Sequence, residues 1–282
     1  MKNNNSPISI VLGVTTIFLG VALVAWTLIP RAQIRTAYTA FHKAKSGDTE
    51  MVLNTGRIFT PYTYAQPQIR NEFLEFTFDL YKNKSAAVMD LLPFANQKMQ
   101  EVVDRDATHP KYLLTMAKGY NLHADLINSK EMYDLSSTYY QKALALVPQN
   151  PDIIYAWGVS LVDQGKSKEG IALLEDLLEA NPNIAESHYY LGLAYYKIGN
   201  YNQALALFEK ALASNPLLNT TTTVDVYVKL FEHYYLKRDI GNFVIVSTRL
   251  STLDTEQGSI HTSILAYIAK HNKLPPINIE KQ

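Results

Sequence analysis

Residues 185–218 read AESHYYLGLAYYKIGNYNQALALFEKALASNPLL, and this stretch decides the fold. Apolar residues recur at helical spacing on either side of Gly199, which predicts two helices joined by a glycine turn. Pro216 follows the second helix and ends it, because proline has no N–H to donate to the preceding turn. The stretch therefore predicts a pair of helices packed as a hairpin.

The preceding stretch, 151–184, repeats the same pattern. Gly158 and Pro182 are separated by the same interval as Gly192 and Pro216, and the second pair follows the first by a constant step. Self-similarity at a fixed period of this length predicts a stack of equivalent structural units, each packed on its neighbours.

This pattern resembles the tetratricopeptide repeat, a helix–turn–helix unit with a period of about 34 residues. The unit from 185 matches most of the family pattern, at Leu191, Gly192, Tyr195, Gly199, Tyr201, Ala204, Phe208, Ala211 and Pro216. The resemblance implies that Gly192 and Ala204 face each other where the two helices cross. The unit from 151 departs from the pattern, with Gly170 in place of the small Ala and Leu161 in place of the Tyr.

Two more divergent units flank these. In the first, Pro148 lies farther from Pro110 than the pattern expects, which predicts about seven extra residues between its helices, around 126–137. The second has Phe231 and Phe243 where the pattern has Gly and Ala. The predicted repeat region is 109–256, divided into 109–150, 151–184, 185–218 and 224–256.

After the repeats, residues 257–282 are predicted to hold a capping helix over 259–271 and then a short disordered tail beginning at Pro275-Pro276. Such a helix would shield the last apolar face of the stack, as the ends of solenoids require. The predicted fold class is therefore all-α: an N-terminal transmembrane helix followed by an α-solenoid.

The transmembrane prediction rests on residues 8–29, which are apolar and lie within an uncharged window between Lys2 and Arg31. As a helix, this stretch spans about 33 Å, which matches a bilayer core of roughly 30 Å. We therefore divide this end into a short tail, 1–7, and a transmembrane helix, 8–30. The alternative is a cleaved signal peptide, although its apolar core is usually roughly 7–15 residues long.

Positive charge next to the span predicts its orientation. Lys2 stands on the N-terminal side, whereas the other side carries Arg31, Arg35, Lys43 and Lys45. The positive-inside count therefore places the bulk of a single-pass membrane protein in the cytoplasm.

Residues 31–108 form a predicted juxtamembrane helical region outside the repeats. Apolar periodicity predicts helices over 31–45, 69–82 and 86–103, the last interrupted at Pro93, with a Pro- and Tyr-rich turn over 60–68.

Composition excludes several classes of function. The 26 basic and 26 acidic residues balance, which argues against a nucleic-acid partner held by surplus positive charge. The absence of cysteine excludes disulfides, iron–sulfur clusters and a Cys nucleophile. None of the seven histidines forms a zinc-helix motif, and no nucleophile elbow or phosphate loop occurs. We therefore predict no enzyme activity, no catalytic residue, no metal site and no cofactor.

A binding surface remains, because the resemblance implies that the first helix of each repeat lines a concave groove. The residues predicted to face a protein or peptide there are Asp152, Tyr155, Val159, Glu186, Tyr189, Leu193, Tyr196, Lys197, Asp225 and Tyr235. Tyrosine buries apolar area while its hydroxyl stays hydrogen-bonded, which suits peptide binding.

The predicted function is a membrane-anchored scaffold or adaptor for protein–protein interactions. An alternative is an accessory, non-catalytic subunit in bacterial surface-polysaccharide assembly. It rests on a resemblance of the whole layout to the C-terminal end of O-antigen ligase or polymerase-type membrane proteins, which carry tetratricopeptide repeats after their last span. Residues 60–76 resemble the segment just after that span, but the ligases' many spans and catalytic residues are absent.

Overall fold

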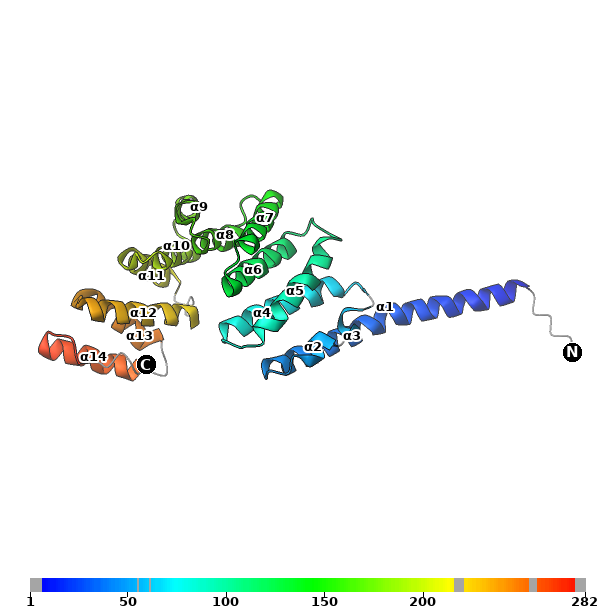
Figure 1. Cartoon of the computed structure of the whole chain (residues 1–282), viewed down its shortest axis with the longest axis horizontal. Helices are drawn as coiled ribbons and strands as arrows, with labels where there is room; N and C mark the ends of the chain where they lie inside the picture. Colours follow the sequence, from blue (N-terminus) through cyan, green and yellow to red (C-terminus); the bar gives the residue numbers. More distant parts are fainter. Residues whose placement is uncertain (1–6, 55, 61, 216–220, 254–257, 277–282) are drawn as a thin grey trace. The chain divides into compact units, whose positions relative to one another are not determined.

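The structure, a computed structural model, describes residues 7–54, 56–60, 62–215, 221–253 and 258–276, with side chains from Trp26 on except at 51, 54, 56–57 and 221–222. All regular secondary structure in these ranges is helical (Figure 1), as predicted. The chain divides into two compact units, 1–157 and 158–282, which are described separately.

The first unit contains seven helices within its described residues and the start of an eighth. They are α1 (Pro7–Lys45), α2 (Glu50–Asn54), α3 (Gly56–Phe59), α4 (Gln66–Lys82), α5 (Val88–Val103), α6 (Pro110–Ile127), α7 (Lys130–Leu146) and α8 (Pro151–Asp163), which continues into the second unit. Helices α4, α5, α6 and α7 pack side by side in order (Figure 1). The short helices α2 and α3 were not predicted from the sequence.

The second unit continues the pattern of helix pairs. Its helices are α9 (Ser167–Ala180), α10 (Ala185–Lys197), α11 (Tyr201–Ser214), α12 (Thr221–Lys237), α13 (Ile240–Leu253) and α14 (Gly258–His271). Helix α14 occupies the predicted capping position and packs on α13, burying Ile264 and Ile268.

The first helix, α1, runs through Pro30 without a break. The predicted membrane span over 8–29 falls mostly on residues whose side chains lie outside the described part. Among the helices that are described, none is long and apolar enough to cross a bilayer.

Glycine makes the two tight turns between paired helices. Gly165 and Gly199 have φ of +78° and +80°, a left-handed conformation that costs glycine little. Just after each turn, the N–H of Lys166 donates to Leu161 O at 2.8 Å, and that of Asn200 donates to Tyr195 O at 2.9 Å. These bonds satisfy carbonyls that the helix end leaves open, so each helix stops at its predicted place.

The crossing of α8 and α9 depends on two glycines. A Cβ added to Gly170 would lie 2.4 Å from the carbonyl oxygen of Gly158, so the two backbones touch. In the next pair, a Cβ added to Gly192 would meet the Phe208 ring at 3.0 Å and Leu207 Cβ at 3.2 Å. An aromatic ring thus packs over this glycine, and the predicted approach of Gly192 and Ala204 stays a prediction.

The predicted insertion between the helices of unit 109–150 is wrong. Only Asn128 and Ser129 separate α6 from α7, so the extra residues lengthen the helices. Asn128 adopts a left-handed conformation with φ of 52°, and the Ser129 hydroxyl accepts from Met132 N. One residue thus ends the first helix and the next caps the second.

The predicted break at Pro93 is also wrong, because α5 continues through it. Pro93 is the sixth residue of this helix, where its missing N–H removes one hydrogen bond to the first turn. The prediction of a turn over 60–68 holds only to Ala65, since α4 begins at Gln66.

Candidate functional site

The predicted groove residues of the second unit lie on three first helices, α8, α10 and α12. We call this set the first-helix face; its members are Val159, Glu186, Tyr189, Leu193, Tyr196, Lys197, Asp225 and Tyr235. Most of these side chains are half-buried, and Lys197 and Asp225 are exposed. The face thus combines a packed base with solvent-accessible atoms.

An ion pair joins equivalent places of two successive repeats. Lys197 Nζ lies 2.5 Å from Asp163 Oδ1, and the two residues are 34 positions apart, which is one repeat period. Both are the thirteenth residue of their units. Their contact therefore places α8 and α10 side by side in the register that the repeat requires.

Aromatic residues line the first-helix face between α10 and α12. The rings of Tyr196 and Tyr201 lie 5.6 Å apart, and Tyr201 lies 4.2 Å from the His233 ring on α12. Burial raises the pKa of Tyr196, and Tyr201 and the carboxylates of Glu232 and Asp225 raise it further. The Tyr196 hydroxyl thus stays protonated near acidic groups and is suited to donate a hydrogen bond.

Tyr189 and Leu193 form the base of the face. Both pack against the core of the second unit, and the Tyr189 ring lies 5.6 Å from Phe208 and 5.4 Å from Tyr190. These contacts hold the rings in place, so little side-chain entropy remains to be lost on binding.

The two predicted site residues of the first unit differ from each other. Asp152 is exposed and lies near Lys118. Desolvation lowers the pKa of Lys118, and the carboxylates of Asp152 and Glu75 offset part of this effect. Tyr155 is only 5% exposed. Little of the Tyr155 side chain is therefore accessible to a partner in this structure, and its predicted place in the groove stays a prediction.

Sequence reasoning missed Tyr201 and His233 as members of this surface. Tyr201 was matched only as part of the repeat pattern, and His233 has no motif around it. The available signal was their separation in the sequence, which is close to one repeat period and places them on adjacent helix pairs.

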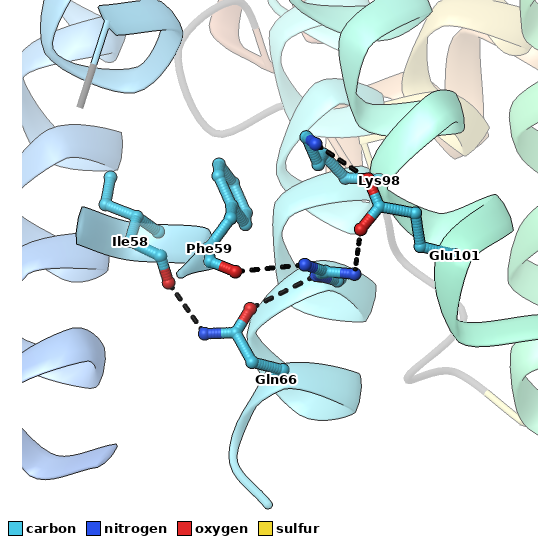
Figure 2. A network of polar contacts seen from close by, with 6 residues as sticks. Ile58, Phe59, Gln66, Lys98 and Glu101 are labelled. Atoms are coloured by element: carbon cyan, nitrogen blue, oxygen red, sulfur yellow. Dashed lines mark hydrogen bonds and ion pairs between the residues drawn. The ribbon is translucent and has the colours of Figure 1, made fainter. Parts of the chain in front are cut away.

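A second polar cluster lies in the first unit, around the buried side chain of Arg70, which is 2% exposed. Figure 2 shows the network, in which Ile58, Phe59, Gln66, Lys98 and Glu101 are labelled. Its guanidinium donates to Phe59 O at 3.1 Å, Gln66 Oε1 at 3.1 Å and Glu101 Oε2 at 2.6 Å. Gln66 in turn donates to Ile58 O at 2.7 Å. The network ties the segment before α4 to α4 and α5, which is a structural role.

The described residues contain no group of three or more His, Asp or Glu side chains that could hold a metal ion. The chemistry that the described side chains offer on the first-helix face is hydrogen bonding, ion pairing and aromatic packing.

Comparison with known proteins agrees with the repeat pattern. Residues 155–218 match the family model described as tetratricopeptide repeat, so the chain carries such repeats there. A curated relative, mitochondrial fission 1 protein of Gibberella zeae, is 31% identical over 100 residues, which are 34% of this chain and 65% of that protein. The chain thus spans just under two thirds of this relative's length.

Several solved structures are similar at low identity. A thermophilic tetratricopeptide-repeat protein of Thermus thermophilus is 17% identical with a TM-score of 0.46, covering 69% of this chain and 97% of that chain. PilW, described as a widely conserved type IV pilus biogenesis factor, is 16% identical with a TM-score of 0.47, covering 66% and 78%. YrrB, described as having an unusual peptide-binding site, is 19% identical with a TM-score of 0.40, covering 82% and 97%.

Proposed function

We propose that this chain is a membrane-anchored scaffold whose first-helix face binds a segment of another protein. The observation that supports this most directly is the ion pair between Asp163 and Lys197, which sets equivalent places of consecutive repeats side by side. A surface with a regular step suits an extended or helical peptide, whose own residues also recur at regular intervals.

The chemistry of the face favours a partner segment with apolar or aromatic anchors and hydrogen-bond acceptors. The Tyr189 and Tyr196 rings are half-buried and held by neighbouring aromatic rings. Buried aromatic anchors of this kind supply much of the binding energy at protein interfaces. Asp225 and Glu232 add negative charge beside Tyr196, which favours a basic residue in the partner.

The membrane anchor is part of the same proposal. The uncharged stretch 8–29 supports it, together with the continuous helical backbone of α1 from Pro7 to Lys45. Tethering would raise the concentration of the binding face near the bilayer without any added contact. Retention of the full chain in membranes washed with alkaline carbonate tests the anchor, and protease protection in closed vesicles tests the predicted cytoplasmic side.

A photo-crosslinking experiment tests the binding face. A photoreactive amino acid replaces Tyr196 in the full-length protein expressed in cells, and a matched control carries it at Ala213, an exposed residue of α11 outside the face. We expect position 196 to form a defined adduct with a partner and position 213 to form none. Substituting Leu193 by Asp should then abolish the adduct, because a carboxylate would replace an apolar contact.

Equal adducts at positions 196 and 213, or an adduct that survives the Leu193→Asp change, would contradict the binding face. The identity of the captured protein separates the two roles considered from the sequence. Capture of a polytopic glycan ligase would favour the accessory role in surface-polysaccharide assembly.

A further inference from the structure

The chain does not leave the molecule after α14. Asn272 adopts a left-handed conformation with φ of 48°, and its N–H donates to Ile268 O at 2.7 Å, which ends the helix and turns the backbone. Pro275 is buried. The prediction that a disordered tail begins at Pro275-Pro276 is therefore wrong for Pro275, whereas Pro276 is exposed; residues 277–282 lie outside the described part.

The returning segment contacts the first-helix face at its last repeat. The Tyr235 hydroxyl donates a hydrogen bond to Pro275 O at 2.9 Å, across 40 residues of sequence. Leu274 packs against the core of the second unit. An open pocket of about 640 Å³ lies beside them, and residues 273–276 form one part of its wall. Tyr235, Leu236, Arg238, Ile240 and Tyr267 form the rest.

The contact has the chemistry by which extended proline segments are recognised. Two consecutive prolines offer no N–H, so their carbonyl oxygens are the backbone groups left to bond. Their preferred extended helix presents those carbonyls and the apolar rings without internal hydrogen bonds. Aromatic-lined surfaces bind such segments through ring packing, and here a Tyr hydroxyl also reaches a prolyl carbonyl.

We propose that the surface around the Tyr235 hydroxyl is a binding site for an extended Leu-Pro-Pro segment, and that residues 274–276 of this chain are its resident occupant. Leu236, 72% exposed at the rim, leaves apolar area that a longer ligand could cover. This inference rests on the proposed function, since Tyr235 belongs to the first-helix face. A partner that binds the last repeat must displace the chain's own segment. The apparent affinity of that partner is therefore its intrinsic affinity multiplied by the fraction of molecules in which the segment is open.

Limited proteolysis of the full-length protein in detergent micelles tests the resident contact. Cleavage after Lys273 requires Leu274 and Pro275 to enter the trypsin active site, so we expect it to depend on opening of the segment. Intact-mass spectrometry distinguishes this cut from others. The Tyr235→Phe variant removes one hydrogen bond, so we expect cleavage there to become about three- to tenfold faster. Tyr81→Phe, at an exposed tyrosine of the first unit, is the matched control and should leave the rate unchanged.

A binding experiment then tests whether the site around Tyr235 recognises residues 274–276 when they are supplied as a separate peptide. The probe is a fluorescent peptide with the sequence of residues 272–282, NKLPPINIEKQ. We expect the full chain carrying Leu274→Ala and Pro275→Ala to bind it about tenfold more tightly than the unchanged chain, because its own segment no longer competes. Adding Tyr235→Phe to that variant should weaken the binding again.

The inference is overturned if Tyr235→Phe leaves cleavage after Lys273 unchanged, or if the peptide binds both chains equally. Photo-crosslinking at position 196 separates this result from the proposed function. If position 196 forms an adduct but Tyr235→Phe leaves the rate of cleavage after Lys273 unchanged, the resident segment is refuted and the proposed binding face is not. If the peptide binds at the Tyr235 site but position 196 forms no adduct, the proposed role of the first-helix face is refuted and the Tyr235 site is not.

Discussion

Replacing Gly170 by alanine should separate α8 from α9 and destabilise the second unit. The new Cβ would lie 2.4 Å from Gly158 O, and 3.1 Å from both Leu161 Cβ and Val162 Cγ2. Ordinary contact begins at 3.4 Å, so the carbonyl alone demands a shift of about 1 Å. The obstructing atom is backbone and cannot rotate away, so the two helices must move apart as bodies.

The magnitude follows from two opposing effects. Overpacking a close contact costs typically about 1–3 kcal/mol. Alanine recovers roughly 0.5–1 kcal/mol of this, because glycine loses more backbone freedom in a helix. We therefore expect Gly170→Ala to lower the free energy of unfolding by about 1–2 kcal/mol, with the loss confined to the pairs that include α8 and α9.

Urea unfolding of the full-length protein in micelles, followed by far-ultraviolet circular dichroism and by the fluorescence of Trp157 on α8, measures this loss. Gly241→Ala is the matched control, because its Cβ would meet nothing nearer than Asp239 Oδ1 at 3.6 Å. We expect the control to be neutral or slightly stabilised. A Gly170→Ala protein as stable as the control would show that the helices do not touch at this point.

Three further changes probe the polar networks. Arg70→Lys should cost about 2 kcal/mol in urea unfolding, because one ammonium cannot replace a guanidinium that serves three acceptors. Burial raises the pKa of Glu101, but Lys98 and Arg70 outweigh this and lower the pKa overall. The stability that Glu101 contributes is therefore full above the unfolded pKa of about 4.3 and is lost as the pH falls through the lower folded pKa. The stability difference between the unchanged protein and Glu101→Gln should accordingly shrink in an acid titration as the pH falls from the unfolded pKa through the folded pKa, and a difference that stays constant over the whole acid range would contradict this assignment. Glu209→Leu should cost about 1–3 kcal/mol, because it removes both the acceptor of the buried Tyr227 hydroxyl, which donates to Glu209 at 2.7 Å, and the carboxylate paired with Arg249. Adding Tyr227→Phe should restore part of the loss in a double-mutant cycle.

Helix pairs whose ends are marked by glycine or proline could be predicted closely from the sequence. The repeat pattern predicted a glycine turn between the two helices of units 151–184 and 185–218, and α8 and α10 each end two residues before that glycine, at Asp163 and Lys197. The signals are local, because a glycine at positive φ or a proline ends a helix whatever surrounds it. The same locality predicted the capping position of α14.

Features that depend on context could not be read in this way. Asn128 and Ser129 look like part of a longer polar loop until their backbone conformations are known. Tyr155 occupies a binding position in the repeat pattern, yet its neighbours bury it. Pro275 looks like the start of a loose tail, yet its carbonyl accepts a hydrogen bond from the Tyr235 hydroxyl 40 residues away. Each outcome is set by tertiary contacts that a single sequence does not display.

The side-chain bonds between repeats in the second unit have a mechanical consequence. Lys197 reaches Asp163, and Tyr234 reaches Asn202 at 3.0 Å, so each bond spans about one period and links neighbouring helix pairs. With such nearest-neighbour links, a force applied to the two ends loads every joint in series instead of sharing the load across one core. Under tension the second unit should therefore extend elastically at first and then unfold one helix pair at a time.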